Sequence, residues 1–442
     1  MGPHVDPVDA DSALPTNTEV VVIGGGIIGV SAALVLAERG VAVVVLEKGQ
    51  VACEQSSRNW GWCRQARRDP RELELIRESL VLWRGLNARL GADTGFRTTG
   101  ILYAARDDRV AFEYEEWVNR ASESGIQAQV IRGGEVAKLL PGDRRPPQAA
   151  LYCAGDGRAE PQLAATAVAR AARRAGAVLL TGCAARAIET AAGSIESVAT
   201  ERGTIRCRAA IVAGGAWSRR ILRDLGIALP QLKVRASVAR SSPVDGAPEA
   251  ALWDEGFAFR KRLDGGYTVA NGRTSVVPLT PDCVRFAWPF LPLLRIGAKD
   301  IKLTLDGRFL TELREASRVS SDRVSPYERV RVLDPPPDEP LLAAALSSLR
   351  DRYPAFARAR FLETWAGFID VTPDAIPVIS EVDDVPGLIV ASGFSGHGFG
   401  IGPAAGQLAA DLATARRPLV PAKEFRLSRF FDGSKTRPIA GI

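Results

Sequence analysis

The stretch Val20-Val21-Val22-Ile23-Gly24-Gly25-Gly26-Ile27-Ile28-Gly29 decides the fold of this chain. Its apolar half reads as a buried strand, and its glycines form a turn into a small-residue helix that ends at Gly40. A second apolar run, residues 41–46, ends at Glu47. This order of elements, a strand, a glycine turn, a helix and a second strand that ends in an acid, is typical of dinucleotide binding. Glu47 is placed to accept hydrogen bonds from an adenosine ribose, and its charge disfavours NADP.

The glycine turn has a distinct expected task at each position. Gly24 permits the tight turn, Gly26 lets a pyrophosphate approach the backbone, and Gly29 lets helix and strand pack closely. The unpaired N–H groups at the helix start, around Ile27 and Ile28, then face the phosphates. The alternative is a glycine-rich loop in an ordinary α/β protein.

Composition limits the class of protein and the setting. The chain has 442 residues, 46% hydrophobic and 24% charged, which favours two packed domains of an ordinary globular enzyme. The net charge of +6 comes from scattered arginines, which argues against nucleic-acid binding. Six cysteines without a CxxC pair favour a reduced, cytoplasmic setting, and only two histidines argue against a metal site.

Several segments further along the chain have clear secondary-structure signals. Apolar residues at steps of three and four predict a helix over residues 71–90, and Pro161 suits the first turn of a helix over 162–175. An apolar strand, residues 209–213, is broken at its carboxyl end by Gly214-Gly215. Asp264-Gly265 predicts a hairpin between residues 257–262 and 267–271.

A second glycine-rich segment lies near the carboxyl end. A short strand, residues 388–391, runs into Gly393-Phe394-Ser395-Gly396-His397-Gly398-Phe399-Gly400-Ile401-Gly402-Pro403, and we expect a helix from Pro403 to residue 415. Small residues let a flat ring system lie against the backbone, and the helix start points its positive end at that ring. NAD needs no such second site, whereas FAD does. The sequence therefore predicts FAD, with flavin contacts from Gly396, His397, Gly398, Phe399, Gly400 and Ile401.

The whole chain resembles the FAD-dependent amino acid oxidoreductases of the D-amino acid oxidase superfamily. Residues 393–399 look like the flavin-contacting segment of sarcosine and glycine oxidases, whereas most of the length is closer to bacterial L-amino acid deaminases. The second likeness is carried by Glu47-Lys48-Gly49, Glu54-Gln55-Ser56-Ser57-Arg58, Cys183-Ala184-Ala185-Arg186, Ala213-Gly214-Gly215-Ala216-Trp217-Ser218-Arg219, Val324-Ser325-Pro326 and Pro377-Val378-Ile379-Ser380-Glu381.

This resemblance implies a fold and a set of cofactor contacts. The fold class is α/β: a Rossmann-like FAD-binding domain of the glutathione-reductase type, with an inserted antiparallel-sheet α+β substrate domain. We expect a flexible tail at 1–18, the FAD-binding domain at 19–97, 151–229 and 360–442, and the substrate domain at 98–150 and 230–359. The further cofactor contacts that the likeness implies are Lys48, Gln55, Ser56, Ser57, Arg58, Ala185, Gly214, Gly215, Trp217 and Gly367.

Two arginines are candidates for binding the carboxylate of an amino acid substrate. Arg260 alternates with the flanking phenylalanines, and its place before Asp264-Gly265 matches the carboxylate-binding arginine of the deaminases. The rival interpretation is a solvated surface arginine. Arg64 is the second candidate, because a similarly placed arginine lies over the flavin in sarcosine oxidases.

Aromatic residues and His397 complete the expected active site. We expect His397 to contact the flavin, whereas the deaminases have a tryptophan at that position as we align them. Trp60, Trp62, Trp365 and Phe368 are candidates for the wall of a side-chain pocket, with burial in an ordinary core as the alternative. Of these, Trp365 and Phe368 belong to the segment 365–368, which we expect to face the flavin. Residues 286–294 form an apolar insertion that either joins the core or docks on a membrane surface.

The function expected from these features is oxidation of an α-amino acid to an imino acid, by hydride transfer from Cα to flavin N5. Hydrolysis then gives a 2-oxo acid and ammonia, and oxygen or a quinone reoxidises the flavin. D-Amino acids, N-methylated glycines and cyclic imino acids stay open as substrates. An NAD-dependent dehydrogenase and an inert flavin-bearing scaffold are the alternatives outside this class.

Overall fold

A six-stranded sheet carries the opening glycine turn in the computed structural model, which describes residues 2–298, 300–314, 320–434 and 436–438. Its first strand, β1, lies at the centre of the sheet and is fully buried, as expected of an unbroken apolar run in a parallel sheet. Neighbours pair in parallel except at one edge, where β21 runs antiparallel to β22. The order is β21 (Val378–Glu381), β22 (Leu388–Ser392), β13 (Ala209–Val212), β1 (Val20–Ile23), β2 (Val43–Leu46), β9 (Val178–Leu180).

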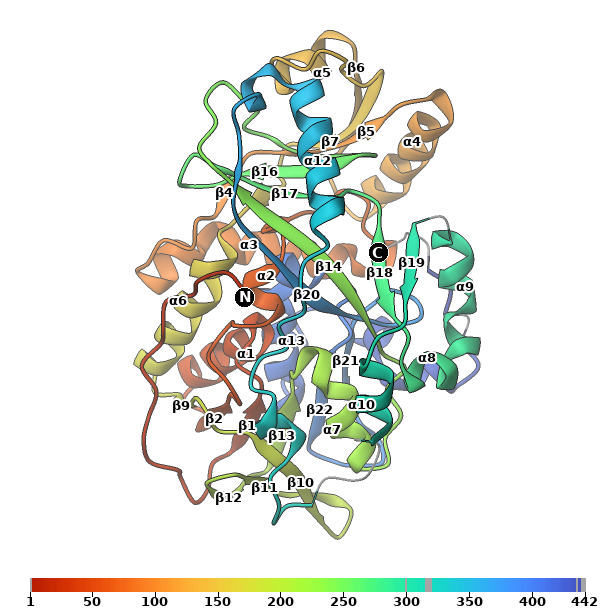
Figure 1. Cartoon of the computed structure of the whole chain (residues 1–442). Coiled ribbons are helices and arrows are strands. Elements are labelled where there is room, and N and C mark those ends of the chain that lie inside the picture. The colour runs from red at the N-terminus through yellow and green to blue at the C-terminus, as the bar shows by residue number, and fades with distance from the viewer. Residues whose placement is uncertain (1, 299, 315–319, 435, 439–442) are drawn as a thin grey trace.

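Four helices pack together on one face of this sheet (Figure 1). α1 lies between α6 and α13, and α3 packs on the far side of α13. Glycines allow the close approach of α13 to α1: a Cβ at Gly402 would lie 2.8 Å from Ile27, and one at Gly406 would lie 2.5 Å from Ser31. The four helices are α1 (Ile27–Glu38), α3 (Leu73–Leu90), α6 (Pro161–Arg174) and α13 (Gly398–Ala413).

The last helix begins five residues earlier than the sequence predicts. Pro403 was expected at the first helical position, but α13 starts at Gly398 and Pro403 lies inside it. A proline there costs the hydrogen bond to the carbonyl of Phe399. Side chains of α3 bind this turn at the next carbonyl, since Ser79 and Trp83 both donate to that of Gly400, at 2.8 and 2.9 Å.

The amino-terminal segment differs from the expected flexible tail. Val5 and Val8 are buried in the core of the six-stranded sheet. Asp11 accepts a hydrogen bond from the Leu179 N–H at 2.8 Å and forms an ion pair with Arg173. Residues 2–18 therefore pack along the domain, a long-range arrangement for which this polar sequence gives no periodic signal.

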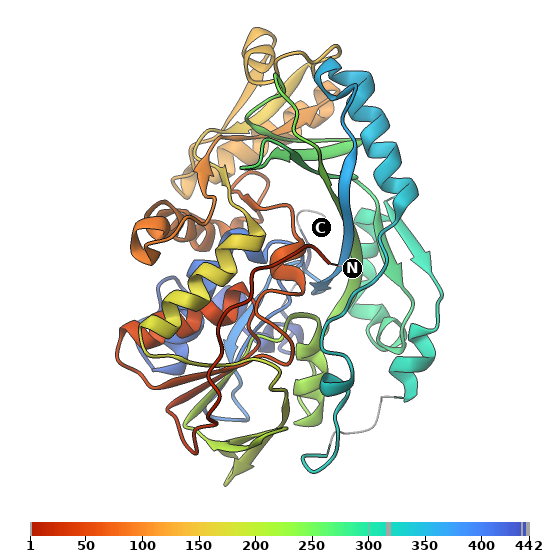
Figure 2. The ribbon, with the colours of Figure 1, turned by 60° about the vertical axis from the view of Figure 1, so that its left-hand side comes forward.

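A large, mostly antiparallel sheet forms the other half of the molecule and carries α12 (Glu339–Arg352) on one face (Figure 2). The predicted hairpin is confirmed, since β16 and β17 pair antiparallel around Asp264-Gly265. β20 pairs with β14 along its whole length, so the strand after the expected boundary at 360 belongs to this sheet. Residues 439–442, assigned to the FAD-binding domain, lie outside the described residues. The order is β19 (Ile301–Thr304), β18 (Ser275–Pro278), β14 (Leu232–Ser241), β17 (Tyr267–Ala270), β16 (Phe257–Lys261), β15 (Ala251–Asp254), β5 (Ile101–Ala105), β7 (Ala149–Cys153), β6 (Gln129–Arg132), with β20 (Phe361–Val371) beside β14.

Smaller elements complete the architecture. A three-stranded antiparallel sheet lies beyond the glycine-turn domain, at the bottom of Figure 1, and a second short sheet joins the two halves. Helix α4 covers the large sheet near β6 and β7. These elements are β10 (Ala185–Ala191), β11 (Ser194–Thr200), β12 (Gly203–Arg206), β3 (Trp62–Cys63), β8 (Gly157–Arg158), β4 (Arg97–Thr98), α2 (Gln55–Arg58), α4 (Asp108–Glu123), α5 (Gly134–Leu139) and α7 (Ser218–Asp224).

The apolar insertion, residues 286–294, forms most of helix α9 (Ala287–Gly297) at one side of the molecule (Figure 1). Helix α8 (Pro281–Arg285) precedes it, and α10 (Arg308–Arg314) follows further along the chain. One face of α9 is core, because Phe290 and Leu293 are buried against residues of β14 and β20. The other face leaves Trp288 83% exposed. Among the described residues, no helix is both long and apolar enough to cross a membrane.

Candidate functional site

A cavity that opens to solvent runs between the two glycine-rich segments. Gly24 and Gly26 line it from the opening turn, Gly396 and Gly398 from the closing segment, and Phe368 from β20. The two distant parts of the sequence therefore meet in one site, as predicted. Further expected cofactor contacts on its walls are Ile27, Ile28, Glu47, Lys48, Gln55, Ser56, Ala185, Gly214, Gly215, Trp217 and Phe399.

The β1–α1 turn provides backbone donors at the middle of the cavity. Gly24 has φ +117°, and a Cβ on it would lie 2.4 Å from the Ala213 carbonyl, so only glycine fits this turn. Helix α1 has no acidic residue in its first turn and no side-chain cap at Gly26. The Ile27 N–H donates to the Ser56 hydroxyl at 2.8 Å. This geometry suits a pyrophosphate, because helix N-termini attract anions.

Glu47 and Lys48 form one end of the cavity. The Glu47 carboxylate accepts hydrogen bonds from the Gly25 and Gly49 N–H groups, both at 2.7 Å. Burial raises the pKa of Glu47 above its ordinary value. Lys48 Nζ lies 4.7 Å from the Trp217 ring and donates to Glu54 at 2.6 Å. An acid at the end of β2 beside the glycine turn is the expected place for a ribose.

Two features of the cavity wall fit a bound cofactor in particular. Gln55 Oε1 is buried and has no hydrogen-bond partner among the described residues, so it is available to a ligand hydroxyl. A Cβ on Gly367 would lie 2.0 Å from that same oxygen, so a side chain at this position would displace Gln55. The start of helix α13 also lines the cavity, through Gly398 and Phe399, and has no acid in its first turn. An extended molecule with phosphates at one helix start and a ring at the other, such as FAD, fits these residues.

The side chain of His397 points away from the predicted flavin contact. It is not on the cavity wall, although Gly396 and Gly398 on either side are. Its Nδ1 lies 3.2 Å from the Glu72 carboxylate, which is fully buried. Arg68 lies 3.6 Å from Glu72 and donates to the His397 carbonyl at 3.2 Å. Burial and the nearby Arg68 lower the pKa of His397 to about 4, so the imidazole is neutral at pH 7.

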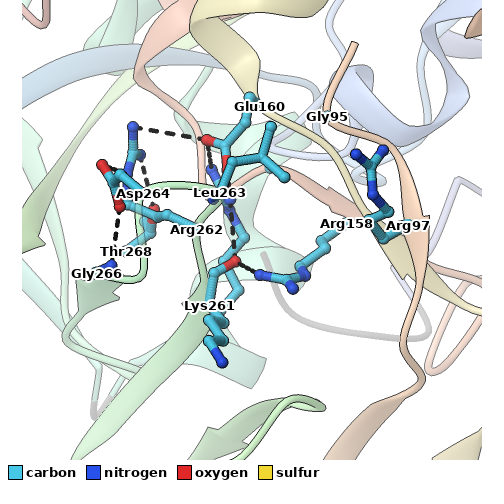
Figure 3. A network of polar contacts seen from close by, with 12 residues as sticks. Gly95, Arg97, Arg158, Glu160, Lys261, Arg262, Leu263, Asp264, Gly266 and Thr268 are labelled. Carbon is cyan, nitrogen blue, oxygen red and sulfur yellow. Dashed lines mark hydrogen bonds and ion pairs between the residues drawn. The ribbon is translucent and has the colours of Figure 1, made fainter. Parts of the chain in front are cut away.

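Arg260 is engaged with a protein carboxylate. Its side chain is fully buried, and its fork donates to both oxygens of Glu160, at 2.8 and 2.9 Å. Its Nε donates to the Trp60 carbonyl. Glu160 also accepts from the Leu263 N–H at 2.9 Å and lies 3.6 Å from Arg262 (Figure 3). The alternation along β16 is as expected, but the guanidinium lies outside the cavity wall and is already paired.

Arg64 has a different environment. It is half-buried, its Nη1 donates to the Ala66 carbonyl, and its guanidinium lies 5.6 Å from the Tyr103 ring. No carboxylate lies within 4 Å of it among the described residues. Its charge contributes to the lowered pKa of His397, which places it near the start of α13. Trp62 packs edge-on against Tyr103 at 6.0 Å, in an apolar core.

Other predicted contacts support the wall without lining it. Gly29 packs against the Gly24 carbonyl, and Ser57 donates to the Glu54 carbonyl at 3.3 Å. Arg58 bonds the Ala366 carbonyl at 2.7 Å and Asp334 at 2.9 Å. Ile401 is buried in the core. The predicted contacts that do not line the cavity are Gly29, Ser57, Arg58, Trp62, Arg64, Arg260, Gly367, His397, Gly400 and Ile401.

Several cavity residues carry no signal in the sequence. Asp370 is buried and accepts from the Gly393 N–H at 2.7 Å, so it holds the start of the closing segment. Only its place two residues before the Thr372-Pro373-Asp374 turn marks it. Tyr327 and Arg331 also line the cavity, although they were assigned to the substrate domain. In the described part of the chain, no group of three or more His, Cys, Asp or Glu residues is arranged to hold a metal.

Known proteins with solved structures share this architecture. L-Amino acid deaminase from Proteus myxofaciens, solved in complex with anthranilate, is 33% identical, with a TM-score of 0.94 and 97% of each chain covered. L-Amino acid deaminase from Proteus vulgaris is 32% identical with a TM-score of 0.92, over 96% of this chain and 100% of that one. The fold predicted from the sequence is thereby confirmed.

Curated relatives include enzymes that act on N-methylated amino acids. Mitochondrial sarcosine dehydrogenase of Mus musculus is 24% identical over 97% of this chain and 43% of its own length. The chain thus spans less than half of that relative. The beta subunit of sarcosine oxidase from Rhizobium meliloti is 23% identical over 94% of this chain and 89% of its own length. Residues 19–412 match the family described as FAD dependent oxidoreductase. The chain belongs to that family, whose cofactor is FAD.

Proposed function

We propose that this chain oxidises an α-amino acid to an imino acid, which water then converts to a 2-oxo acid and ammonia. The observation that carries the proposal is the single cavity formed by the opening turn, the closing segment and β20. When bound, FAD accepts the two electrons and the hydrogen of the Cα–H bond as a hydride. The similarity to L-amino acid deaminases supports this reaction class.

Arg64 is the residue that we propose for the substrate carboxylate. A guanidinium binds a carboxylate through two parallel N–H donors. In the described part of the chain, only one side-chain donor of Arg64 has a hydrogen-bond partner, the Ala66 carbonyl. Neither arginine lines the cavity, so the two differ in their pairing: Arg260 is less suited, because binding a substrate would require it to release Glu160. The Arg64 guanidinium lies 5.6 Å from the Tyr103 ring, which Arg67 also approaches at 5.4 Å.

The chain's other residues orient the substrate and exclude water. Phe368 and Phe399 are buried on the cavity wall and keep the reacting bond in an apolar surrounding. The start of α13 lines the cavity, and its unpaired N–H groups would favour negative charge on a ring bound there. The proposed step starts from a neutral amine and needs no strong base, in keeping with a neutral, enclosed His397.

The test is anaerobic bleaching of the visible spectrum of the purified yellow holoenzyme. A panel of L-amino acids, D-amino acids, sarcosine and proline separates the substrate classes, and ammonia is measured after turnover. We expect bleaching by at least one α-amino acid and loss of kcat/KM in R64A. A holoenzyme that no amino acid reduces would refute the proposal, and an undiminished R64A would remove Arg64 from it.

N-Methylated or cyclic amino acids are the second candidate substrate class. The curated relatives favour them, because sarcosine dehydrogenase and sarcosine oxidase are among these proteins. With such a substrate the products are an imine and then an amine in place of ammonia. Bleaching by sarcosine or proline but by no primary amino acid would select this alternative.

We also propose peripheral contact with a membrane through the insertion, which bears on whether a quinone or oxygen accepts the electrons. Trp288 of the insertion is 83% exposed, and Val284 on the preceding helix α8, next to Arg285, is 74% exposed. Exposed apolar side chains beside a cation suit the surface of an anionic bilayer. W288S should reduce flotation with anionic liposomes. Wild-type protein that stays wholly unbound would refute the contact.

A further inference from the structure

The segment of residues 325–334, here called the strap, crosses from the insertion to α12 over the FAD-binding domain. It begins with α11 (Pro326–Arg329), which is closed by a capping box between Ser325 and Glu328. The Glu328 carboxylate also accepts hydrogen bonds from Nε and Nη2 of Arg186 on β10, at 2.9 and 2.8 Å. This ion pair is mostly buried, so the start of the strap is fixed to the FAD-binding domain.

The middle of the strap is bound reciprocally to Lys48, the residue after Glu47. Lys48 Nζ donates to the carbonyls of Val330 and Arg331, at 3.2 and 2.7 Å. Arg331 returns a hydrogen bond from Nη1 to the Lys48 carbonyl at 2.8 Å. Its Nη2 donates to Glu201 at 2.6 Å, between β11 and β12. The strap backbone lies so close that a Cβ on Gly49 would be 2.7 Å from the Arg331 carbonyl.

The end of the strap is held by α2 and the residue before it. The Leu333 N–H donates to Glu54 at 3.1 Å, and Arg58 pairs with Asp334 at 2.9 Å. Glu54 also accepts from Lys48 and from the Trp217 indole. The Glu54 carboxylate therefore connects the strap with Lys48, which follows β2, and with Trp217 on the cavity wall.

Two strap side chains form part of the cofactor cavity itself. Tyr327 and Arg331 line it together with Glu47, Lys48, Ala185 and Trp217. The Tyr327 ring is 3% exposed and packs edge-on against Trp217 at 5.6 Å. This end of the cavity is the one with the ribose-binding acid, so it is the end for the AMP half of the cofactor, away from the closing segment.

We propose that the strap is the outer wall of the AMP half of the FAD site, and that its Arg331 contacts set how slowly FAD leaves. The cofactor is then enclosed by a segment that lies within the residues predicted for the substrate domain, 230–359. The inference depends on FAD binding and is independent of which substrate is oxidised. Its test therefore needs no turnover.

The experiment compares FAD with FMN, which has the flavin and one phosphate but lacks the AMP half. The rate of flavin release from diluted holoenzyme is measured by fluorescence for wild type, R331A and R329A, each loaded with FAD or FMN. Arg329 is the matched control, because its guanidinium donates to the Val324 carbonyl and it does not line the cavity. We expect R331A to release FAD at least tenfold faster, with FMN release unchanged and R329A like wild type.

A second variant and salt keep the test decisive if R331A folds poorly. E201Q loosens the same contact from the other side and should also accelerate FAD release alone. The Arg331–Glu201 pair is partly exposed, so salt should speed FAD release in wild type more than in R331A. Unchanged FAD release in both variants would refute the proposal. Equal acceleration of FAD and FMN release would do so too, because it would indicate general loosening.

Discussion

The buried pair of Arg260 and Glu160 makes the most quantitative prediction. Removing one partner of a buried, bidentate ion pair leaves an uncompensated charge and costs about 3 to 5 kcal/mol. The pKa of Glu160 gives a second measure: burial raises it, but Arg260, with smaller contributions from Arg262 and the Leu263 N–H, holds it at about 2, below an ordinary 4.5. That difference corresponds to about 3 kcal/mol of stability. R260M should therefore lower the free energy of unfolding of the holoenzyme by about 3 kcal/mol.

The assay is a double-mutant cycle with R260M, E160Q and the double variant, read by urea unfolding of the FAD-loaded protein. The amide that E160Q introduces keeps an acceptor for the Leu263 N–H, so the double variant loses both charges while this donor stays paired. We expect each single variant to be less stable than the double variant, with a coupling of at least about 2 kcal/mol. The double variant should keep kcat/KM within about tenfold of wild type.

The pH dependence follows from the same pair. A carboxyl whose folded pKa is depressed contributes stability above its unfolded pKa, and that stability is lost as pH falls. The free energy of unfolding of the wild type should therefore fall by about 3 kcal/mol between pH 4.5 and 2. The double variant should not show this fall, because it has no carboxyl group at position 160. Additive single effects would refute the structural role of the pair. A stable double variant without activity would return Arg260 to the substrate site.

Three further predictions concern other parts of the molecule. G406V should lower the free energy of unfolding by more than about 3 kcal/mol and release FAD, because the added side chain would displace Ser31 and separate α1 from α13. G85A on α3 is the control: it has open space around it and should be neutral or stabilising by up to about 1 kcal/mol, as measured by thermal unfolding. His397, with its pKa lowered to about 4, should cause loss of stability as pH falls from 6.5 to 4, and H397Q should flatten that part of the stability profile. E47A should weaken FAD binding by about tenfold in a titration of deflavinated protein, because the Gly25 and Gly49 N–H groups lose their acceptor; unchanged affinity would remove Glu47 from the site.

The parts of the site that could be predicted from the sequence are those determined by local backbone chemistry. Gly24 needs a positive φ beside the Ala213 carbonyl, and this requirement is visible as a glycine between an apolar run and a small-residue helix. The closing segment is recognisable for the same reason. Both glycine-rich segments therefore lie on the cavity as expected.

Sequence patterns within one segment could not show the pairings between distant side chains. Alternation along β16 gives the face that Arg260 occupies, but it cannot indicate that Glu160, one hundred positions earlier, supplies its partner. His397 sits between two cavity glycines, yet Glu72 on another element draws its side chain away. Asp370 and Arg331 were missed because their roles depend on contacts with the Gly393 N–H and with Lys48.

The choice between the two candidate arginines rests on what each would gain by binding a substrate. Arg260 already has a carboxylate at both arms of its fork in a dry environment, so a substrate would only exchange one anion for another. Arg64 is half-buried beside the start of α13, with no protein carboxylate within 4 Å among the described residues. A substrate carboxylate would supply the missing partner and form charge-assisted hydrogen bonds with the guanidinium, without breaking an existing ion pair. R64K should then bind substrate more weakly than wild type while keeping the charge, because an ammonium cannot reproduce the fork. Equal KM values for the two proteins would contradict this assignment.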